Sequence, residues 1–293
     1  MEIKKGDKKW KKLGKIALGL ALLLGLSSCG NKEESKVTSN SNSTENPKEK
    51  QSIKIGVVGE YNDVLNEVIK RYEEKTGNDV ELVVFSDYNQ PNEVLESGDI
   101  DLNAYQHKKF LEEFNKDHKT ELISIGNTML APLGIYSKKY KSLDEVKEND
   151  EIVIPNDASN GARALFLLQD AGLIKVKGEK GDPVTVEDIK ENPKNLKITE
   201  VDAAQTARNL DSAALAIVND TFALDSKIAT EYPALKFEES KADDTNPYVN
   251  VFAAKKERKD DKVLNDFVKN YYQTDATKKD YEKLTGGAWI PAW

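Results

Sequence analysis

The chain has 293 residues, which allows one large domain or two of ordinary size, and 38% of its residues are hydrophobic and can supply a buried core. Its 51 acidic residues exceed its 43 basic ones for a net charge of -8, which disfavours a nucleic-acid partner because phosphate neutralisation needs clustered surplus cations. One cysteine and two histidines exclude Cys-rich zinc modules and iron–sulfur clusters, so we expect neither a metal nor a cofactor.

Residues 1–28 have the pattern of a secretory signal. A lysine-rich start is followed by an apolar run at 16–26, which is shorter than the roughly 20 residues that span a bilayer. Leu26-Ser27-Ser28-Cys29 then resembles the lipobox of bacterial lipoproteins, in which the chain is cut before the cysteine and the thiol is acylated. The alternative is an ordinary buried thiol in a long signal sequence. We favour lipidation at Cys29, with the protein held by its lipid at the extracytoplasmic face of the cell membrane.

Residues 29–52 follow as a segment rich in Ser, Asn, Lys and Glu without an aromatic residue. Such a composition buries too little apolar surface to offset the entropy lost on ordering. We expect a flexible tether between the lipidated Cys29 and a globular body.

The globular body begins with alternating strand and helix patterns. Residues 53–58 form a continuous apolar run that is typical of a strand buried on both faces, and 62–75 carry apolar residues at helical spacing. A second strand is expected at 80–85 and a short helix at 92–96. This order predicts a parallel sheet with right-handed crossovers.

A second alternating series follows residues 130–136, which contain Pro132 and Gly134 and therefore suit a connecting or edge segment. The expected elements of this series are strands at 151–155, 196–201 and 213–218 and helices at 161–171 and 202–209. A solvated loop is expected at 175–182.

The end of the chain returns to the first series, with a strand at 248–254 and amphipathic helices at 262–272 and 276–284. We therefore predict two α/β lobes, the first from 53–131 plus 249–293 and the second from 132–248. The chain would cross twice between them, near 130–136 and 246–250, with a ligand cleft between the lobes.

The segment 155–165 (PNDASNGARAL) is the most informative one for function. A strand ends there in a polar turn that opens a helix, with Ser159 or Asn160 as the expected N-cap. Arg163 lies in the first turn, where a cation opposes the helix dipole, which favours an anionic partner such as a ligand carboxylate. The equally weighted alternative is a surface ion pair with Asp157. The second glycine and the Lys-Ser/Thr ending of a phosphate-binding P-loop are both missing.

A polar and aromatic cluster is expected at 101–111 (DLNAYQHKKFL). Tyr105 and His107 would share one side of the chain there, with Phe110 one turn further on, which offers an apolar wall with a polar tip. Core packing is the alternative for the two aromatic rings. The other histidine, His118, is interpreted as a solvated helix end.

The sequence contains no catalytic motif that we recognise. It has no Gly-x-Ser-x-Gly elbow and no HExxH, and its acidic pairs, such as those at 243–244 and 260–261, suit solvated surface. These observations favour binding without turnover, so we do not expect an enzyme.

Several long segments resemble the NlpA family, the methionine-binding lipoproteins of methionine ABC importers. The resemblance covers about residues 53–293 and is carried by DLNAYQHKKFL, MLAPLGIYS, IVIPNDASNGARALFLLQDAGLIKVK, VTVEDIKENPKNLKITEVDAAQ, AIVND and NPYVNVFAAK. It implies the type II periplasmic-binding-protein fold, in which two α/β lobes joined by a two-strand hinge close on a ligand. It also implies a monomer that delivers its ligand to an ABC transporter permease.

The resemblance implies roles for particular residues. Arg163 would hold the ligand carboxylate and Asn219 would bind the amino-acid backbone atoms, while Asn246 would add a polar contact. The side-chain pocket would be lined by Tyr88, Tyr105 and His107.

One departure from the family pattern leaves the ligand open. Relatives commonly carry proline and tyrosine where this chain has Lys109 and Phe110, so Phe110 keeps the apolar wall and loses a hydroxyl. L-Methionine is favoured, and D-methionine, a methionine-containing dipeptide and another apolar amino acid remain alternatives. Two further alternatives are a surface adhesin with a vestigial cleft and an enzyme acting on an amino acid.

Overall fold

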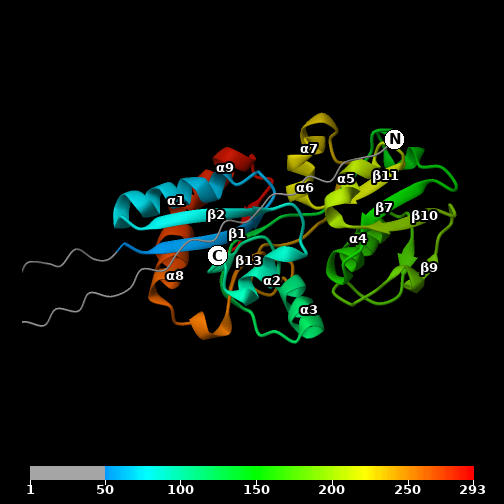
Figure 1. Cartoon of the computed structure of the whole chain (residues 1–293). Helices are drawn as coiled ribbons and strands as arrows, with labels where there is room; N and C mark the ends of the chain where they lie inside the picture. Colours follow the sequence, from blue (N-terminus) through cyan, green and yellow to red (C-terminus); the bar gives the residue numbers. More distant parts are fainter. Residues whose placement is uncertain (1–49) are drawn as a thin grey trace, which may run out of the picture. The chain divides into compact units, whose positions relative to one another are not determined.

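Two five-stranded sheets organise the chain in the computed structural model, which describes residues 50–293. The predicted signal, Cys29 and nearly all of the predicted tether lie outside the described residues. Figure 1 shows β1, β2 and β13 grouped with α1, α8 and α9, and β7, β10 and β11 grouped with α4, α5 and α6. The predicted arrangement of two α/β lobes is thereby confirmed.

The first sheet has the strand order β2-β1-β3-β13-β4. Its strands are β1 (Ser52–Val58), β2 (Asp79–Phe85), β3 (Leu102–Asn103), β4 (Ile123–Asn127) and β13 (Val251–Ala254). The predicted parallel pairing holds for β1 with β2 and β3, whereas β13 pairs antiparallel with β3 and β4. The sheet is therefore mixed, because the late strand β13 returns to it from the second lobe.

The helices of the first lobe follow the predicted order. They are α1 (Asp63–Thr76), α2 (Gln90–Ser97), α3 (Lys108–His118), α8 (Lys262–Asp266), a π-helical continuation (Phe267–Tyr272) and α9 (Asp275–Thr285). The amphipathic pattern of α1 buries Val64, Leu65, Val68, Ile69 and Tyr72. Gly77 ends that helix in the left-handed conformation, as glycine allows without steric penalty.

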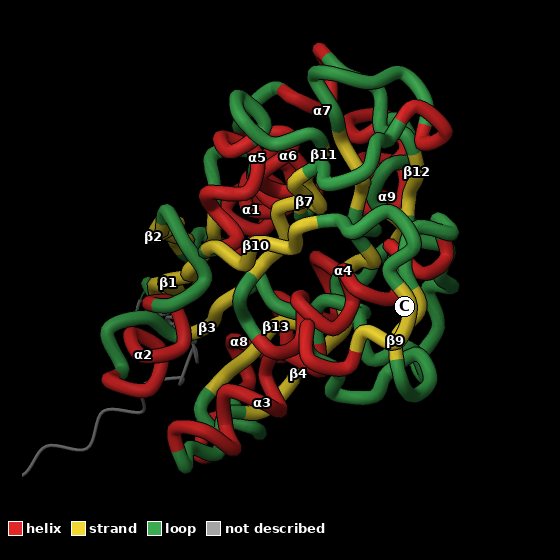
Figure 2. The backbone as a smooth tube through the Cα atoms, turned by 90° about the vertical axis from the view of Figure 1, so that its right-hand side faces the viewer, coloured by secondary structure: helices red, strands yellow, loops and turns green. Residues whose placement is uncertain are grey.

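The second sheet has the order β10-β7-β11-β6-β12. Its strands are β6 (Gly134–Tyr136), β7 (Glu151–Pro155), β10 (Lys197–Val201), β11 (Leu215–Val218) and β12 (Lys236–Phe237). The tube in Figure 2 follows β10, β7 and β11 beside one another. The helices of this lobe are α4 (Ala158–Asp170), α5 (Thr206–Asn209), α6 (Asp220–Asp225) and α7 (Ile228–Glu231).

Several predicted boundaries in the second lobe were wrong. Gly134–Tyr136 is an inner strand between β11 and β12 and not a connecting or edge segment, because Pro132 falls before it and Gly134 leaves room for the ring of Tyr136. The helix predicted at 161–171 begins at Ala158. The helix predicted at 202–209 is a 3-10 turn followed by the short α5. The predicted loop at 175–182 begins with β8 (Lys175–Val176), which pairs with β9 (Ile189–Glu191).

The two crossings between the lobes lie side by side. Thr128 N donates to Asn250 O at 2.7 Å, and Asn250 N donates to Met129 O at 2.8 Å. The end of the chain joins them, because β14 (Ile290–Pro291) pairs with β5 (Met129–Leu130). This is the two-strand connection that the sequence predicted. The lobe boundaries at 131/132 and 248/249 stay predictions.

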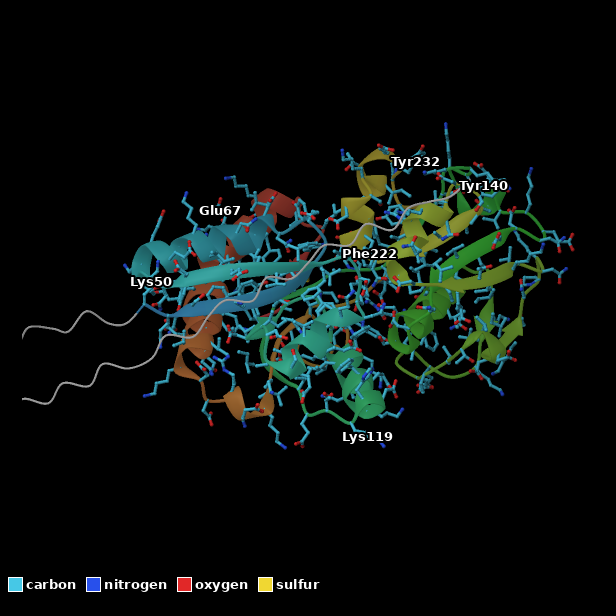
Figure 3. All side chains as sticks on the ribbon, viewed as in Figure 1. Lys50, Glu67, Lys119, Tyr140, Phe222 and Tyr232 are labelled. Carbon is cyan, nitrogen blue, oxygen red and sulfur yellow. The ribbon has the colours of Figure 1, made fainter. Side chains whose placement is uncertain are left out.

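Each lobe has its own apolar core, and a third apolar cluster is shared between the lobes. Val58 and Tyr105 of the first lobe meet Tyr136, Val153 and Phe222 of the second in this cluster. Figure 3 labels Phe222 in the region where the two groups of elements meet. The lobes are thus in contact in this structure. Among the helices of residues 50–293, none combines the length and apolar character that a bilayer span requires.

Substitution of Phe252 in β13 tests how much this strand contributes to the stability of the first lobe. Its side chain is fully buried, with edge contacts to Phe267 and Tyr272. Phe252→Ala is expected to lower the free energy of unfolding by about 3–5 kcal/mol through lost burial and a new cavity. Urea denaturation measures the change. Val84→Ala, at a residue that is 46% exposed, should change it by well under 1 kcal/mol and is the control.

Candidate ligand-binding site

A cavity between the lobes contains most of the predicted site residues. It encloses about 380 Å³ of space that protein atoms do not fill, part of which opens to solvent. Its walls come from both lobes and consist of Tyr88, Tyr105, Gln106, His107, Phe110, Ala131, Asn160, Arg163, Asn219, Asp220, Thr221 and Asn250. The enclosed part of this space amounts to about 20 Å³, which holds about one water molecule, so a ligand of amino-acid size enters only when the lobes part.

Arg163 is the cation of this cavity, and it is only 3% exposed. Its Nε donates to Glu238 Oε1 at 2.9 Å and to Oε2 at 3.1 Å, and Nη2 also bonds Glu238. Nη2 further donates to the carbonyl of Ala131 at 3.0 Å, and the ring of Tyr248 lies 4.6 Å from the guanidinium carbon. The expected alternative of a pair with Asp157 is therefore wrong, because the ionic partner is 75 residues away in sequence.

Glu238, Ala131 and Tyr248 fix the orientation of the Arg163 guanidinium and leave one of its nitrogens without a hydrogen bond from these groups. Among the described residues, no hydrogen bond is made by Nη1 of Arg163, while Nε and Nη2 are engaged. A guanidinium whose orientation is already held loses little freedom when its remaining donor meets a carboxylate.

The start of α4 is capped by Asp157 and not by Ser159 or Asn160 as the sequence suggested. Its carboxylate accepts from Asn160 N at 2.9 Å and from Asn160 Nδ2 at 3.0 and 3.1 Å. The side chain of Asn160 can then only present its oxygen to the cavity. That Oδ1 accepts from Asn219 Nδ2 at 2.9 Å. The cap therefore sets the orientation of both amides.

Asn219 carries an unsatisfied acceptor at the cavity wall. Its Nδ2 is used by Asn160, and its Oδ1 is buried without a hydrogen-bond partner among the described residues. Leaving a buried carbonyl oxygen unpaired is unfavourable by about 1–3 kcal/mol. A ligand donor such as an ammonium group would satisfy this oxygen.

His107 is a neutral donor. Its Nδ1 accepts from Phe110 N at 3.0 Å and so caps α3, which places the ring proton on Nε2, 3.3 Å from Asn160 Oδ1. Burial, and to a smaller extent the charge of Arg163, lowers the pKa of His107 to about 3. The ring therefore adds no charge to the cavity at neutral pH.

The aromatic wall comes from the first lobe. The ring of Tyr88 lies 5.6 Å from that of Tyr105 and 6.0 Å from that of Phe110, and Phe222 approaches Tyr88 from the second lobe at 4.8 Å. Burial raises the pKa of both Tyr88 and Tyr105, so their hydroxyls stay protonated. The wall can bury an apolar ligand side chain and offers donors at its edge.

Asp220 is the one acidic residue among those that line the cavity, and the sequence analysis did not single it out. It is 5% exposed and accepts from Trp289 Nε1, which belongs to the first lobe. Burial raises its pKa to about 6, and the Trp289 hydrogen bond opposes the rise. The ionised form of Asp220 is therefore unfavourable at neutral pH unless a cation lies beside it.

The structure brings together six of the seven predicted ligand-binding residues, which are Tyr88, Tyr105, His107, Phe110, Arg163 and Asn219. It does not bring Asn246 to this cavity. The amide of Asn246 donates to Ser240 Oγ and to Lys241 O at 2.6 Å each, in a separate groove on the other side of Arg163. Asn250 lines the cavity instead, four residues later on the same crossing.

Sequence reasoning also missed Asn160, Asp220 and Glu238. Asn160 lies within the segment 155–165, where it was considered only as an N-cap, and Asp220 ends the segment AIVND beside Asn219, so both stood in segments already singled out without being assigned to the site. Glu238 carries no local signal, because only the folded second lobe brings it to Arg163. Within residues 50–293 we find no group of three metal-ligating side chains.

Two α/β lobes that enclose a held cation, one unsatisfied amide oxygen and an aromatic wall define a binding protein that closes on a small molecule. Comparison with known proteins identifies the kind. The sequence profile of the NlpA lipoprotein family matches residues 53–293, and the chain belongs to that family.

Individual relatives agree with this assignment. The D-methionine-binding lipoprotein MetQ of Escherichia coli K12 is 42% identical over 249 residues, which cover 84% of this chain and 90% of the relative. The substrate-binding protein of a methionine transporter from Streptococcus pneumoniae is 38% identical with a TM-score of 0.77, covering 83% of this chain and 96% of that one. A nutrient-binding protein from Burkholderia cenocepacia bound to methionine is 39% identical with a TM-score of 0.76, covering 82% and 100%.

The raised pKa of Asp220 makes a prediction about stability without ligand. Its value of about 6 exceeds the ordinary 3.8, so the folded protein binds more protons than the unfolded chain between these pH values, and wild-type stability falls as the pH rises. Asp220→Asn removes the titrating carboxyl and with it the loss of stability at higher pH. The amide oxygen of the new side chain can still accept the hydrogen bond from Trp289. We expect the variant to be more stable at pH 7.5 by up to about 3 kcal/mol, with the difference vanishing near pH 4.

Urea denaturation of ligand-free protein at pH 4, 5.5 and 7.5 measures this difference. If the free energies of unfolding of variant and wild type differ by the same amount at all three pH values, the titration assigned to Asp220 is wrong.

Proposed function

We propose that this protein captures methionine, with L-methionine as the preferred ligand, and delivers it to the permease of an ABC importer. The observation that supports the proposal most is that one cavity is lined by a cation, a buried unpaired acceptor and aromatic rings. Within residues 50–293, Nη1 of Arg163 and the buried Oδ1 of Asn219 make no hydrogen bond, and the aromatic wall is apolar. A zwitterion with an apolar side chain satisfies all three.

Each part of the ligand has a partner of matching chemistry in this proposal. The carboxylate meets Arg163, and the ammonium meets Asn219 Oδ1 and Asp220. The thioether packs on Tyr88, Tyr105 and Phe110, where sulfur–aromatic contact adds about 0.3–1.5 kcal/mol to the hydrophobic gain. Because contacts come from both lobes, ligand binding favours the closed arrangement.

The names of the relatives support methionine as the ligand class. The proposal also includes the role of the protein in transport. The protein acts as a monomer that binds and releases methionine unchanged, and not as an enzyme. A surface adhesin has less support, because an adhesin with a vestigial cleft has no need of a buried, held cation beside an unsatisfied amide.

Titration calorimetry of the full chain with L- and D-methionine tests the proposed ligand. Wild type should bind methionine, and Asn219→Ala should weaken binding by about ten- to a hundredfold because the ammonium loses its buried acceptor. Asn270→Ala serves as the matched control, since this exposed amide donates to Asp266 in the first lobe, away from the cavity. If wild type binds neither enantiomer, or if Asn219→Ala binds as wild type does, the proposed ligand or its orientation is wrong.

We further propose that acylated Cys29 anchors the protein at the extracytoplasmic face of the cell membrane. Cys29→Ser should move the protein from the membrane fraction to the soluble fraction, because acyl chains and not a polybasic face would hold it. Fractionation with immunodetection, together with the mass of the N-terminal peptide, checks this. Ser35→Ala in the predicted tether is the control. Retention of Cys29→Ser in the membrane fraction would refute the anchor.

A further inference from the structure

Helix α6 connects the cavity to the other lobe. It follows β11 of the second sheet, and its N-cap is Asn219, the residue with the free oxygen in the cavity. Figure 1 shows α6 at the side of the second lobe that faces the first. Along its six residues the helix makes three kinds of contact with the first lobe.

The carboxylate of Asp225 is received by backbone amides of the first lobe. Oδ1 accepts from Glu60 N at 3.1 Å and from Tyr61 N at 3.2 Å, and Oδ2 accepts from Glu60 N at 3.1 Å. The preceding Gly59 has a φ of +82°, and a Cβ there would collide with Asp225. The turn after β1 is thus shaped around this carboxylate, which is a strong acceptor for amide donors.

The start of α6 is held by the end of the chain. Asp220 accepts from Trp289 Nε1. Trp289 packs within the first lobe against Tyr61 at 5.5 Å and Tyr281 at 6.4 Å, just before β14 pairs with the crossing strand β5. This indole is fixed to the first lobe and reaches across to the second.

Apolar contacts lie between these two polar ones. Phe222 packs on Tyr88 at 4.8 Å, and Leu224 packs against the core of the first lobe. Hinge opening that parts the lobes removes all of these contacts together. They therefore stabilise the closed form and not the open one.

We propose that α6 is the clasp that holds the lobes closed, and that Asp225 sets ligand affinity without touching the ligand. This inference rests on the proposed function for the ligand used in its test. Asp225 does not line the cavity, so it acts as a positioning residue through the equilibrium between open and closed forms. When only the closed form binds the ligand, the apparent affinity equals the affinity of the closed form multiplied by the fraction of molecules that are closed.

The test measures methionine binding to Asp225→Ala in the full chain. We expect an affinity about tenfold weaker than wild type, with the loss in a faster dissociation rate, because the contact breaks on opening. Trp289→Phe keeps the ring, removes the donor from the other lobe and should change affinity in the same direction. Asp211→Ala removes an exposed ion pair to Lys138 within the second lobe and is the matched control.

A second readout follows the lobes directly. Spin labels on cysteines introduced at the exposed Lys70 in α1 and Lys190 in β9 report the distance between the lobes. At a methionine concentration that closes most wild-type molecules, Asp225→Ala should retain a larger open population. A purely structural role for Asp225 would lower thermal stability without moving this distribution.

The outcomes separate the two proposals. If wild type does not bind methionine, the proposed function fails. If wild type binds and Asp225→Ala binds with unchanged affinity, dissociation rate and lobe distances, the clasp is overturned whatever the result for Trp289→Phe, because Trp289 also contacts the cavity residue Asp220.

Discussion

The buried charge of Arg163 is the constraint around which the second lobe and the crossing strands are arranged. An isolated guanidinium in a protein interior is strongly unfavourable, so its burial requires a partner that is also buried. Glu238 supplies that partner, with its side chain 10% exposed. Ala131 on the crossing adds a carbonyl, and Tyr248 adds a ring face. Because these groups flank β12 and both crossings, holding the cation also sets the geometry where the lobes meet.

A chain of side-chain contacts links the cavity wall to the contacts between the lobes. Asp157 caps α4 and orients Asn160, which in turn orients Asn219, so one local capping contact determines which way two cavity amides point. Asn219 then begins α6, whose two carboxylates reach donors of the first lobe. A ligand that engages Asn219 therefore acts on the element that contacts the other lobe, and binding and closure become one equilibrium.

Local patterns in the sequence predicted what is local in the structure. The apolar run of β1 and the helical spacing of α1 are confirmed because burial follows periodicity there. Six of the seven predicted residues line one cavity: the segments 101–111 and 155–165 supplied four of them, and the family resemblance supplied Tyr88 and Asn219. Glu238 could not be found, since its pairing with Arg163 depends on the register of β12. The choice of Asn250 over Asn246 likewise follows from the backbone pairing of Asn250 with the other crossing, which no sequence pattern specifies.

The charges of the cavity favour a ligand that is itself neutral overall but charged at both ends. Arg163 and Glu238 already balance each other, and His107 stays neutral because of its lowered pKa. Asp220 is ionised only at a cost, which a nearby ammonium would relieve. An anionic side chain would face Tyr88, Tyr105 and Phe110 without a cation to pair with. The cavity thus discriminates by leaving an extra negative charge desolvated, which rejects a wrong ligand more strongly than a missing apolar contact does.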